Sequence, residues 1–100
     1  MRKEEKDLCK LAKLNRFHRY NPKYRTQRMR LIQNAENVME YLTDYRIKQL
    51  FYRHYIKGDS WVEISCDENI IFDTLRKQCS RAVKKAVDEM YAVRDYAEAC

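Results

Sequence analysis

A chain of 100 residues that contains one glycine and one proline has few ways to make a tight turn. Turns and sheet corners draw on these two residues, because glycine adopts left-handed backbone angles and proline fixes one angle in advance. The residue types that favour helix, such as Leu, Ala, Lys, Arg, Glu, Gln and Met, are abundant. The sequence therefore predicts an all-α protein, a small domain of helices joined by short connections.

Apolar residues recur at helical spacing along most of the chain. This spacing predicts helices over residues 4–19, 24–42, 44–57 and 60–67, and a long helix from about 71 nearly to the C-terminus. The expected inner faces hold, in chain order, Leu8, Leu11, Leu14 and Phe17; Met29, Ile32, Ala35, Met39 and Leu42; Ile47, Leu50, Phe51 and Tyr55 or His54; and Leu75, Cys79, Ala82, Val83, Ala86, Val87 and Met90.

Residues with particular backbone preferences stand between these helices. Asn21-Pro22 is expected to break the chain, because proline disfavours helix at the residue before it. Thr43 is predicted to cap the start of the third helix with its hydroxyl. Gly58 is predicted to end that helix in the left-handed conformation, which glycine adopts without steric cost.

The segment from about residue 55 to 85 has the plan of a helix-turn-helix with an extra helix in front. Ser60 and Glu63 fit a capping box at the start of a short helix, which is expected to bury Trp61 and Ile64. Asn69 suits a turn because asparagine tolerates left-handed angles. The capped short helix, the turn and the basic helix that follows match the order of elements in helix-turn-helix DNA-binding modules.

Positive charge is concentrated in two parts of the chain, whose formal net charge is +6. Residues 1–30 hold 11 basic and 3 acidic residues, and residues 71–85 hold 5 and 1. The segments 31–70 and 86–100 each carry an excess of three acidic residues. Two separate basic segments suit a polyanion that passes both of them, although charge alone is also typical of a well-solvated helix surface.

The last helix is predicted to present a stripe of polar and basic residues opposite its apolar face. The stripe consists of Phe72, Asp73, Arg76, Lys77, Ser80, Arg81, Lys84 and Lys85. A basic stripe on a helix held by a rigid support can enter the major groove of DNA. Phe72 has two interpretations that stay open, a contact with a thymine methyl group or an ordinary core or interface aromatic.

The same segment resembles region 4 of sigma-70-type factors, and more closely the small phage and prophage transcription regulators of the ArpU type. The resemblance is carried by Trp61, Glu63, Ile64 and Ser65, by Asn69 at the turn, by Thr74, Leu75 and Arg76, and by the run from Ser80 to Lys85. It needs no gap and covers residues 50–85, about a third of the chain. Two positions depart from the family: Glu68 replaces a buried Leu, and Ile71 replaces a capping Ser or Thr.

The resemblance implies a sequence-specific transcription regulator of phage or prophage origin that binds double-stranded DNA at the nucleoid of a bacterial host. A cytoplasmic location is expected from the lack of an apolar stretch of membrane-spanning length and of a recognisable signal peptide. The resemblance also implies a helix-turn-helix domain over residues 44–100, preceded by a basic helical extension over residues 1–43. Arg76 and Lys77 would lie where base edges are reached, and Arg81, Lys84 and Lys85 nearer to phosphates. The alternatives are a module that contacts RNA polymerase or a sigma factor, or a DNA-packaging accessory similar to small terminase components.

Other functional classes lack support in the sequence. There is no nucleophile–base pair and no glycine-rich phosphate loop, so neither an enzyme nor a cofactor is predicted. The four cysteines include no Cys-x-x-Cys, so no metal site is predicted; Cys66 and Cys79 are expected to be buried, and Cys9 and Cys100 exposed. No apolar stretch approaches the ~20 residues that cross a membrane, and no leader peptide is recognised.

The C-terminal segment from Val83 to Ala97 has apolar residues near heptad spacing. Fewer than three clean heptads support a coiled coil only weakly. The segment is therefore predicted to pack within the chain, which is the favoured interpretation. The alternative is that this segment or the N-terminal helix forms a homodimer, which would double the DNA contacts.

Overall fold

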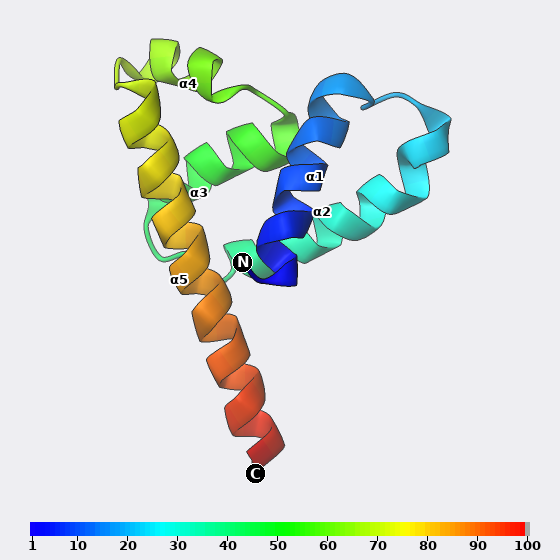
Figure 1. Cartoon of the computed structure of the whole chain (residues 1–100), viewed down its shortest axis with the longest axis vertical. Helices are drawn as coiled ribbons and strands as arrows, with labels where there is room; N and C mark the ends of the chain where they lie inside the picture. Colours follow the sequence, from blue (N-terminus) through cyan, green and yellow to red (C-terminus); the bar gives the residue numbers. More distant parts are fainter. Residues whose placement is uncertain (100) are drawn as a thin grey trace.

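The computed structural model describes residues 1–99, and these residues form helices and short connections with no strand (Figure 1). The all-α prediction is thereby confirmed. The elements are α1 (Lys3–Phe17), a 3₁₀ turn η1 (Pro22–Tyr24), α2 (Arg25–Met39), α3 (Tyr45–Phe51), a π-helical segment η2 (Tyr52–Lys57), α4 (Trp61–Glu68) and α5 (Phe72–Ala99). Helices α1 to α4 gather around the first part of α5, whose C-terminal end projects from the body (Figure 1).

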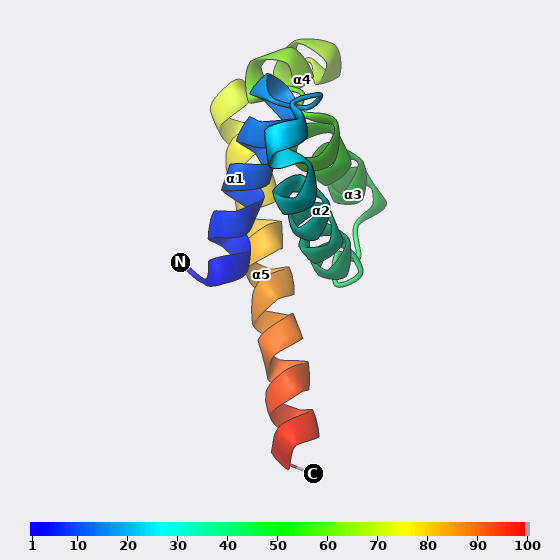
Figure 2. The same cartoon turned by 90° about the vertical axis from the view of Figure 1, so that its right-hand side faces the viewer.

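A single hydrophobic cluster joins all five α-helices. Leu11 of α1, Ala35 of α2, Phe51 of α3, Ile64 of α4 and Leu75 of α5 are each 0% exposed and belong to this cluster. Burying one such large apolar side chain contributes about 1.5–3 kcal/mol. The N-terminal helices α1 and α2 are therefore part of the same core as the segment that follows them, and they pack against each other, crossing in Figure 1 and running next to each other in Figure 2.

The inner face of α1 agrees with the sequence prediction except at its end. Leu8, Leu11 and Leu14 are buried, but Phe17 is 67% exposed, so its predicted burial is wrong. The apolar spacing of α1 continues to Phe17, but the helix ends at this residue and the chain turns toward α2. The side chain of Phe17 therefore lies beyond the helices that cover the earlier turns.

The inner face of α2 differs from the prediction by a rotation of the helix. The buried residues of α2 are Leu31, Ala35 and Val38, while Ile32 and Met39 are half-buried. Leu42, predicted within this helix, is buried but lies in the connection that follows Met39. Met29, predicted to face inward, is 59% exposed because the first turns of α2 form an outer corner with the end of α1 (Figure 1). From Leu31 onward the apolar face of α2 packs into the core.

The start of α3 is capped by Asp44, and the prediction of Thr43 is wrong by one residue. The Asp44 Oδ1 atom accepts hydrogen bonds from the backbone N–H groups of Arg46, at 2.9 Å, and Ile47, at 3.4 Å. A carboxylate at this position also interacts favourably with the positive end of the helix dipole. The predicted helix over residues 44–57 is realised as α3 followed by the π-helical segment η2.

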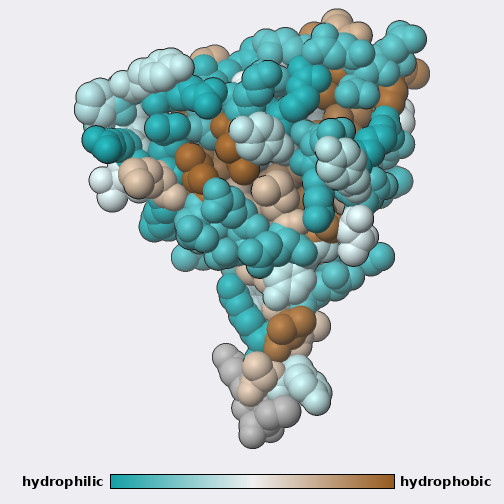
Figure 3. All heavy atoms as spheres, turned by 180° about the vertical axis from the view of Figure 1, so that it is seen from behind, coloured by the Kyte–Doolittle hydropathy of each residue, from teal (hydrophilic) through white to brown (hydrophobic). Residues whose placement is uncertain are grey.

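The long helix α5 packs against the body through about the first two thirds of its length, as far as Met90. Leu75, Cys79, Val83, Ala86, Val87 and Met90 are buried, as predicted, and Ala82 is half-buried. Packing within the chain therefore accounts for the apolar face of α5 as far as Met90. Beyond that residue the helix projects, Val93 is 53% exposed and Ala97 is exposed, and hydrophobic atoms are visible on the projecting end (Figure 3).

The cysteines follow the prediction in part. Cys79 is buried in the core, where burial raises the pKa of its thiol to about 12, and Cys9 is exposed. Cys66 is exposed, contrary to prediction, because the short helix α4 turns only one side, that of Ile64, toward the core. Cys100 lies outside the described residues. Within residues 1–99 no helix is both long and apolar enough to span a membrane.

Candidate nucleic-acid interface

The short helix α4 has the cap that its sequence predicts. The hydroxyl of Ser60 accepts the Glu63 N–H at 3.1 Å, and the Glu63 carboxylate accepts the Ser60 N–H at 3.4 Å. This reciprocal pair satisfies two backbone donors at the helix start and contributes about 1 kcal/mol. Asn69 ends the helix in the left-handed conformation, with φ 55° and ψ 40°, as predicted. The chain therefore turns directly from α4 into α5 over Ile70 and Ile71.

Gly58 forms the turn between η2 and α4 and packs closely against the backbone of α1. Its φ is +92°, and a Cβ atom at this position would lie 2.9 Å from the backbone carbon and oxygen of Asn15. The buried Asn15 donates from Nδ2 to the carbonyl of Tyr55 at 2.9 Å, and Arg19 donates to the carbonyl of Lys57 at 3.0 Å. The end of α1 and the residues just after it therefore bind the last turn of η2, directly before α4.

Arg53 ties the two ends of α4 together. Its Nε lies 3.0 Å from Oδ2 of Asp59, and its Nη2 lies 2.7 Å from Oδ2 of Asp67. Asp59 stands in the turn before α4, and Asp67 in the last turn of that helix. One guanidinium, with its fixed planar set of donors, thus holds both the start and the end of α4 against η2.

His54 and Trp61 form a stacked pair where η2 meets α4. Their ring centroids are 3.9 Å apart with an interplanar angle of 19°, and the His54 Nδ1–H donates to the carbonyl of Asp59 at 2.9 Å. Burial lowers the pKa of His54; the hydrogen bond to Asp59 opposes this shift, and nearby Arg16 adds to it. The imidazole is therefore neutral near pH 7, and Trp61 anchors α4 against the core while staying half-buried.

The stripe predicted on the last helix lies on the solvent side of α5. All of its members are exposed: Phe72, Asp73, Arg76, Lys77, Ser80, Arg81, Lys84 and Lys85. Phe72 is 40% exposed at the first turn of the helix, so it is not a core residue. The structure thus brings the predicted positions together on one continuous face, supported from behind by α3 and α4 (Figure 1).

The charges of this stripe are distributed unevenly along α5. Asp73 lies 3.0 Å from Nη2 of Arg76 and 3.0 Å from Nζ of Lys77, and the hydrogen bond from Arg76, followed by that from Lys77, lowers the pKa of its carboxyl group. Farther along, Arg81, Lys84 and Lys85 have no acidic partner within 4 Å among the described residues. The first half of the stripe is therefore partly neutralised, and its second half is not.

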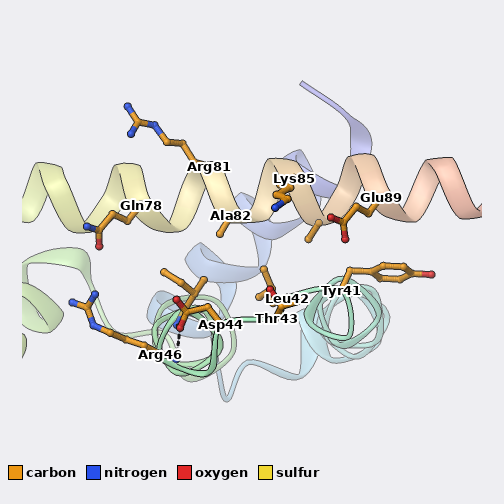
Figure 4. A pocket seen from close by; sticks show the side chains of 12 residues that line it. Tyr41, Leu42, Thr43, Asp44, Arg46, Gln78, Arg81, Ala82, Lys85 and Glu89 are labelled. Atoms are coloured by element: carbon orange, nitrogen blue, oxygen red, sulfur yellow. Dashed lines mark hydrogen bonds between the residues drawn. The ribbon is translucent and has the colours of Figure 1, made fainter.

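A groove of about 440 Å³ runs beside the stripe, between α5 and the connection from α2 to α3. Figure 4 shows Gln78, Lys85 and Glu89 along the α5 wall, and Asp44 and Arg46 on the opposite wall. Arg81 is directed away from the body, toward solvent (Figure 4). Because the groove carries both signs of charge, a polyanion would meet the outward face of α5 rather than the groove.

Three supporting residues, Asn15, Arg19 and Arg53, were not predicted from the sequence. Each acts on partners that lie 6 to 40 residues away along the chain, and no local pattern marks such contacts. In the described part of the chain, no group of three or more His, Cys, Asp or Glu residues is arranged to hold a metal ion.

The chain was compared with protein-family models, curated proteins and solved structures, and none of them matches it. The resemblance to sigma region 4 and to ArpU-type regulators therefore stays a prediction from residues 50–85.

Proposed function

We propose that the protein is a sequence-specific DNA-binding transcription regulator of the phage or prophage type, and that it places α5 in the major groove of double-stranded DNA. The observation that carries the proposal is the exposed basic stripe of α5, held by a capped and anchored α4. A helix presented in this way has the width and the donors that the major groove accepts. The proposal needs no cofactor and no catalytic group.

The two ends of the stripe have different roles in this proposal. Arg76 and Lys77 stand near the start of α5, where a recognition helix reaches base edges. Asp73 holds both side chains on the helix surface, so DNA must compete with this carboxylate for their donors. Arg81 and Lys84, free of acidic partners in the described structure, are available to phosphates and position the helix along the backbone.

The proposal is tested by fluorescence anisotropy with random duplex DNA and with duplexes from the genomic neighbourhood of the coding sequence, each across a salt series. A specific regulator binds one native duplex more tightly than random DNA, and its affinity falls steeply with salt as counterions are released. Absence of binding to every duplex at low salt would remove the proposal. It would favour the alternative in which the module contacts RNA polymerase or a sigma factor.

Two substitutions separate the roles along the stripe. Arg76→Ala is expected to reduce the preference for the native duplex, by about 1–3 kcal/mol if the side chain reads a guanine. Arg81→Ala is expected to weaken native and random duplexes alike and to lower the salt slope by about 0.9. Lys6→Ala, an exposed lysine on α1 outside the stripe, is the matched control. If neither stripe variant differs from this control, α5 does not contact DNA.

A further inference from the structure

A second basic surface lies where α1 turns into α2. No acidic residue occurs between Asp7 and Glu36, and eight Lys or Arg residues fall within that stretch. The reversal at η1 brings the two arms of this stretch together, so that the last turns of α1 and the first turns of α2 form one corner (Figure 1). We call the exposed surface of residues 13–30 the α1–α2 corner.

The charge of the α1–α2 corner is not balanced within the described structure. The one ion pair that reaches from it to an acidic group joins Arg16 to Glu63 at 3.9 Å, and both side chains stay substantially exposed, at 39% and 58%. Arg19 donates to a neutral backbone carbonyl, and Arg28 donates to the amide oxygen of Asn15. Exposed positive charges gathered without acids raise the local potential and attract a polyanion.

The α1–α2 corner also exposes aromatic rings among its charges. Phe17 is 67% exposed and Tyr20 is 91% exposed, and each follows an arginine in the run Arg16-Phe17-His18-Arg19-Tyr20. The Arg16 guanidinium lies 5.4 Å from the centroid of the Phe17 ring. Neither ring is used by the core, so Tyr20 and the face of Phe17 turned away from Arg16 are available to a planar ligand.

We propose that the α1–α2 corner binds single-stranded nucleic acid, with its lysines and arginines on phosphates and with Phe17 and Tyr20 stacked on unpaired bases. Single strands offer both chemistries at once, a charged backbone and accessible base faces. A duplex offers phosphates but keeps its base faces stacked inside. The exposed rings, which a purely phosphate-binding surface does not need, therefore favour the single strand over the duplex.

The corner and the α5 stripe are separate surfaces. The corner and α5 lie at opposite sides of the body in Figure 1, and in the view of Figure 2 the corner faces the viewer with the start of α5 behind it. A strand held at the corner would leave the stripe free for duplex DNA. The proposal rests on residues of α1, η1 and α2 and does not depend on duplex recognition by α5.

The experiment uses the full chain and a fluorescein-labelled oligothymidylate of about 20 nucleotides, a length sufficient for one compact binding surface. The double variant Phe17→Ala, Tyr20→Ala is expected to lower the affinity for oligothymidylate at least about 30-fold, from the loss of stacking on two bases. Affinity for duplex DNA is expected to change by less than twofold. Tyr45→Ala, which removes a 74% exposed tyrosine outside the corner, is the matched control and should change neither affinity.

A second measurement tests whether the two surfaces are independent. Saturating unlabelled duplex is expected to leave oligothymidylate bound, whereas Arg81→Ala should weaken only the duplex. A parallel titration with oligouridylate distinguishes RNA from DNA as the source of the strand. Failure of duplex binding with intact oligothymidylate binding would remove the proposed function of α5 and leave this proposal standing.

Three outcomes would overturn the proposal. The first is equal oligothymidylate affinity for the aromatic double variant and the Tyr45→Ala control. The second is complete displacement of oligothymidylate by duplex, which would place both ligands on one surface. The third is corner-dependent binding to vesicles of phosphatidylglycerol and phosphatidylcholine without oligothymidylate binding, which would assign the corner to an anionic membrane.

Discussion

The α5 stripe and the α1–α2 corner have the same sign of charge but are built differently. The stripe lies along one straight helix, at helical spacing, and carries Asp73 among its basic residues. The corner is a chain reversal with no acidic residue and with two strongly exposed aromatic rings, Phe17 and Tyr20. A regular array on a rigid rod matches a groove of fixed geometry, whereas a curved surface with rings suits a flexible strand.

Both surfaces depend on a common support at the junction of α1 with η2. Asn15 and Arg19, near the end of α1, bind the carbonyls of Tyr55 and Lys57, and Gly58 packs against the α1 backbone. The same helix end therefore carries the corner on one side and orients α4, which supports α5, on the other. Net charge alone would not distinguish the two surfaces, whereas their shape and their aromatic content do.

The largest expected effect comes from Gly58→Ala, which disrupts the common support at the junction of α1 with η2. The new Cβ would lie 2.9 Å from the Asn15 backbone at a φ of +92°. Backbone strain of this kind costs about 1–3 kcal/mol, before any displacement of α1. We expect urea unfolding to show a loss of at least about 2 kcal/mol, and both ligands to bind more weakly.

Asn69→Gly is the control for Gly58→Ala, because it changes the other left-handed residue, with φ 55°, to the residue type that tolerates this angle best. Its unfolding free energy should stay within about 0.5–1 kcal/mol of the wild type. If Gly58→Ala were as stable as Asn69→Gly, the close packing of the turn against α1 would not be the shared support of the two surfaces.

The next largest effect is a pH dependence of stability that arises from His54, which lies at the junction that supports both surfaces. Burial lowers the pKa of His54 in the folded state, while the unfolded chain titrates near the ordinary value of 6.5. The stability that neutral His54 contributes is therefore fully present above pH 6.5. It is lost as the pH falls below 6.5 and through the lower pKa of the folded state. We expect acidification from pH 7.5 to 5.5 to destabilise the wild type more than His54→Phe, in urea unfolding at each pH.

The loss of stability at low pH should weaken the binding of both duplex DNA and oligothymidylate. His54 stacks on Trp61 of α4 and lies near Arg16 at the end of α1, so its protonation disturbs the support of both surfaces. An identical pH dependence of stability in the wild type and His54→Phe would show that the imidazole does not titrate differently on folding. A loss confined to duplex binding would show that the junction supports α5 alone.

Most of the fold was predictable because local signals agree with the tertiary packing. Gly58, Asn69 and the Ser60–Glu63 box each carry a strong conformational preference, and each stands where the preference predicts. The errors fall where packing decides instead. Phe17 and Met29 continue an apolar pattern past the region that neighbouring helices cover, and their exposure could not be read from spacing alone.

The candidate sites were predictable to different extents. The α5 stripe follows from helical periodicity, which a single segment determines, so its exposed positions agree with the prediction. The corner was recognisable only as basic composition, because its shape depends on how α1 and α2 pack. The contacts of Asn15 and Arg53 join residues distant in the chain, and no spacing rule predicts such pairs.

Single charge substitutions in the α5 stripe and in the α1–α2 corner are expected to have smaller effects on ligand affinity. Asp73→Asn removes the acidic residue of the stripe that pairs with Arg76 and Lys77, and we expect duplex affinity to rise by a factor of about 2–5 at low salt. Gln27→Glu makes the opposite change in the corner, adding an acid at an exposed position in the first turn of α2. We expect oligothymidylate affinity to fall about 2–5-fold, with helix stability preserved by the helix dipole.

These two variants are controls for each other. Each should change the affinity for one ligand and leave the affinity for the other within about twofold, because exposed charges are screened beyond about 10 Å. Anisotropy at 50 mM and 300 mM salt provides the measurement, with both differences shrinking at the higher concentration. Equal effects of either variant on both ligands would show that the stripe and the corner form one continuous electrostatic surface.

The smallest expected effect concerns the projecting end of α5. Val93 and Tyr96 are 53% and 74% exposed, and Ala97 is exposed, so this end offers few apolar side chains to a second copy. Stable dimers bury more than about 1,000 Å², which such a short stretch does not supply. Light scattering at micromolar concentration should therefore give the monomer mass of 12.3 kDa, unchanged by Val93→Lys. A dimer mass that Val93→Lys abolishes would instead make this end a dimer interface and double the α5 stripe available to DNA, while leaving each corner to act alone.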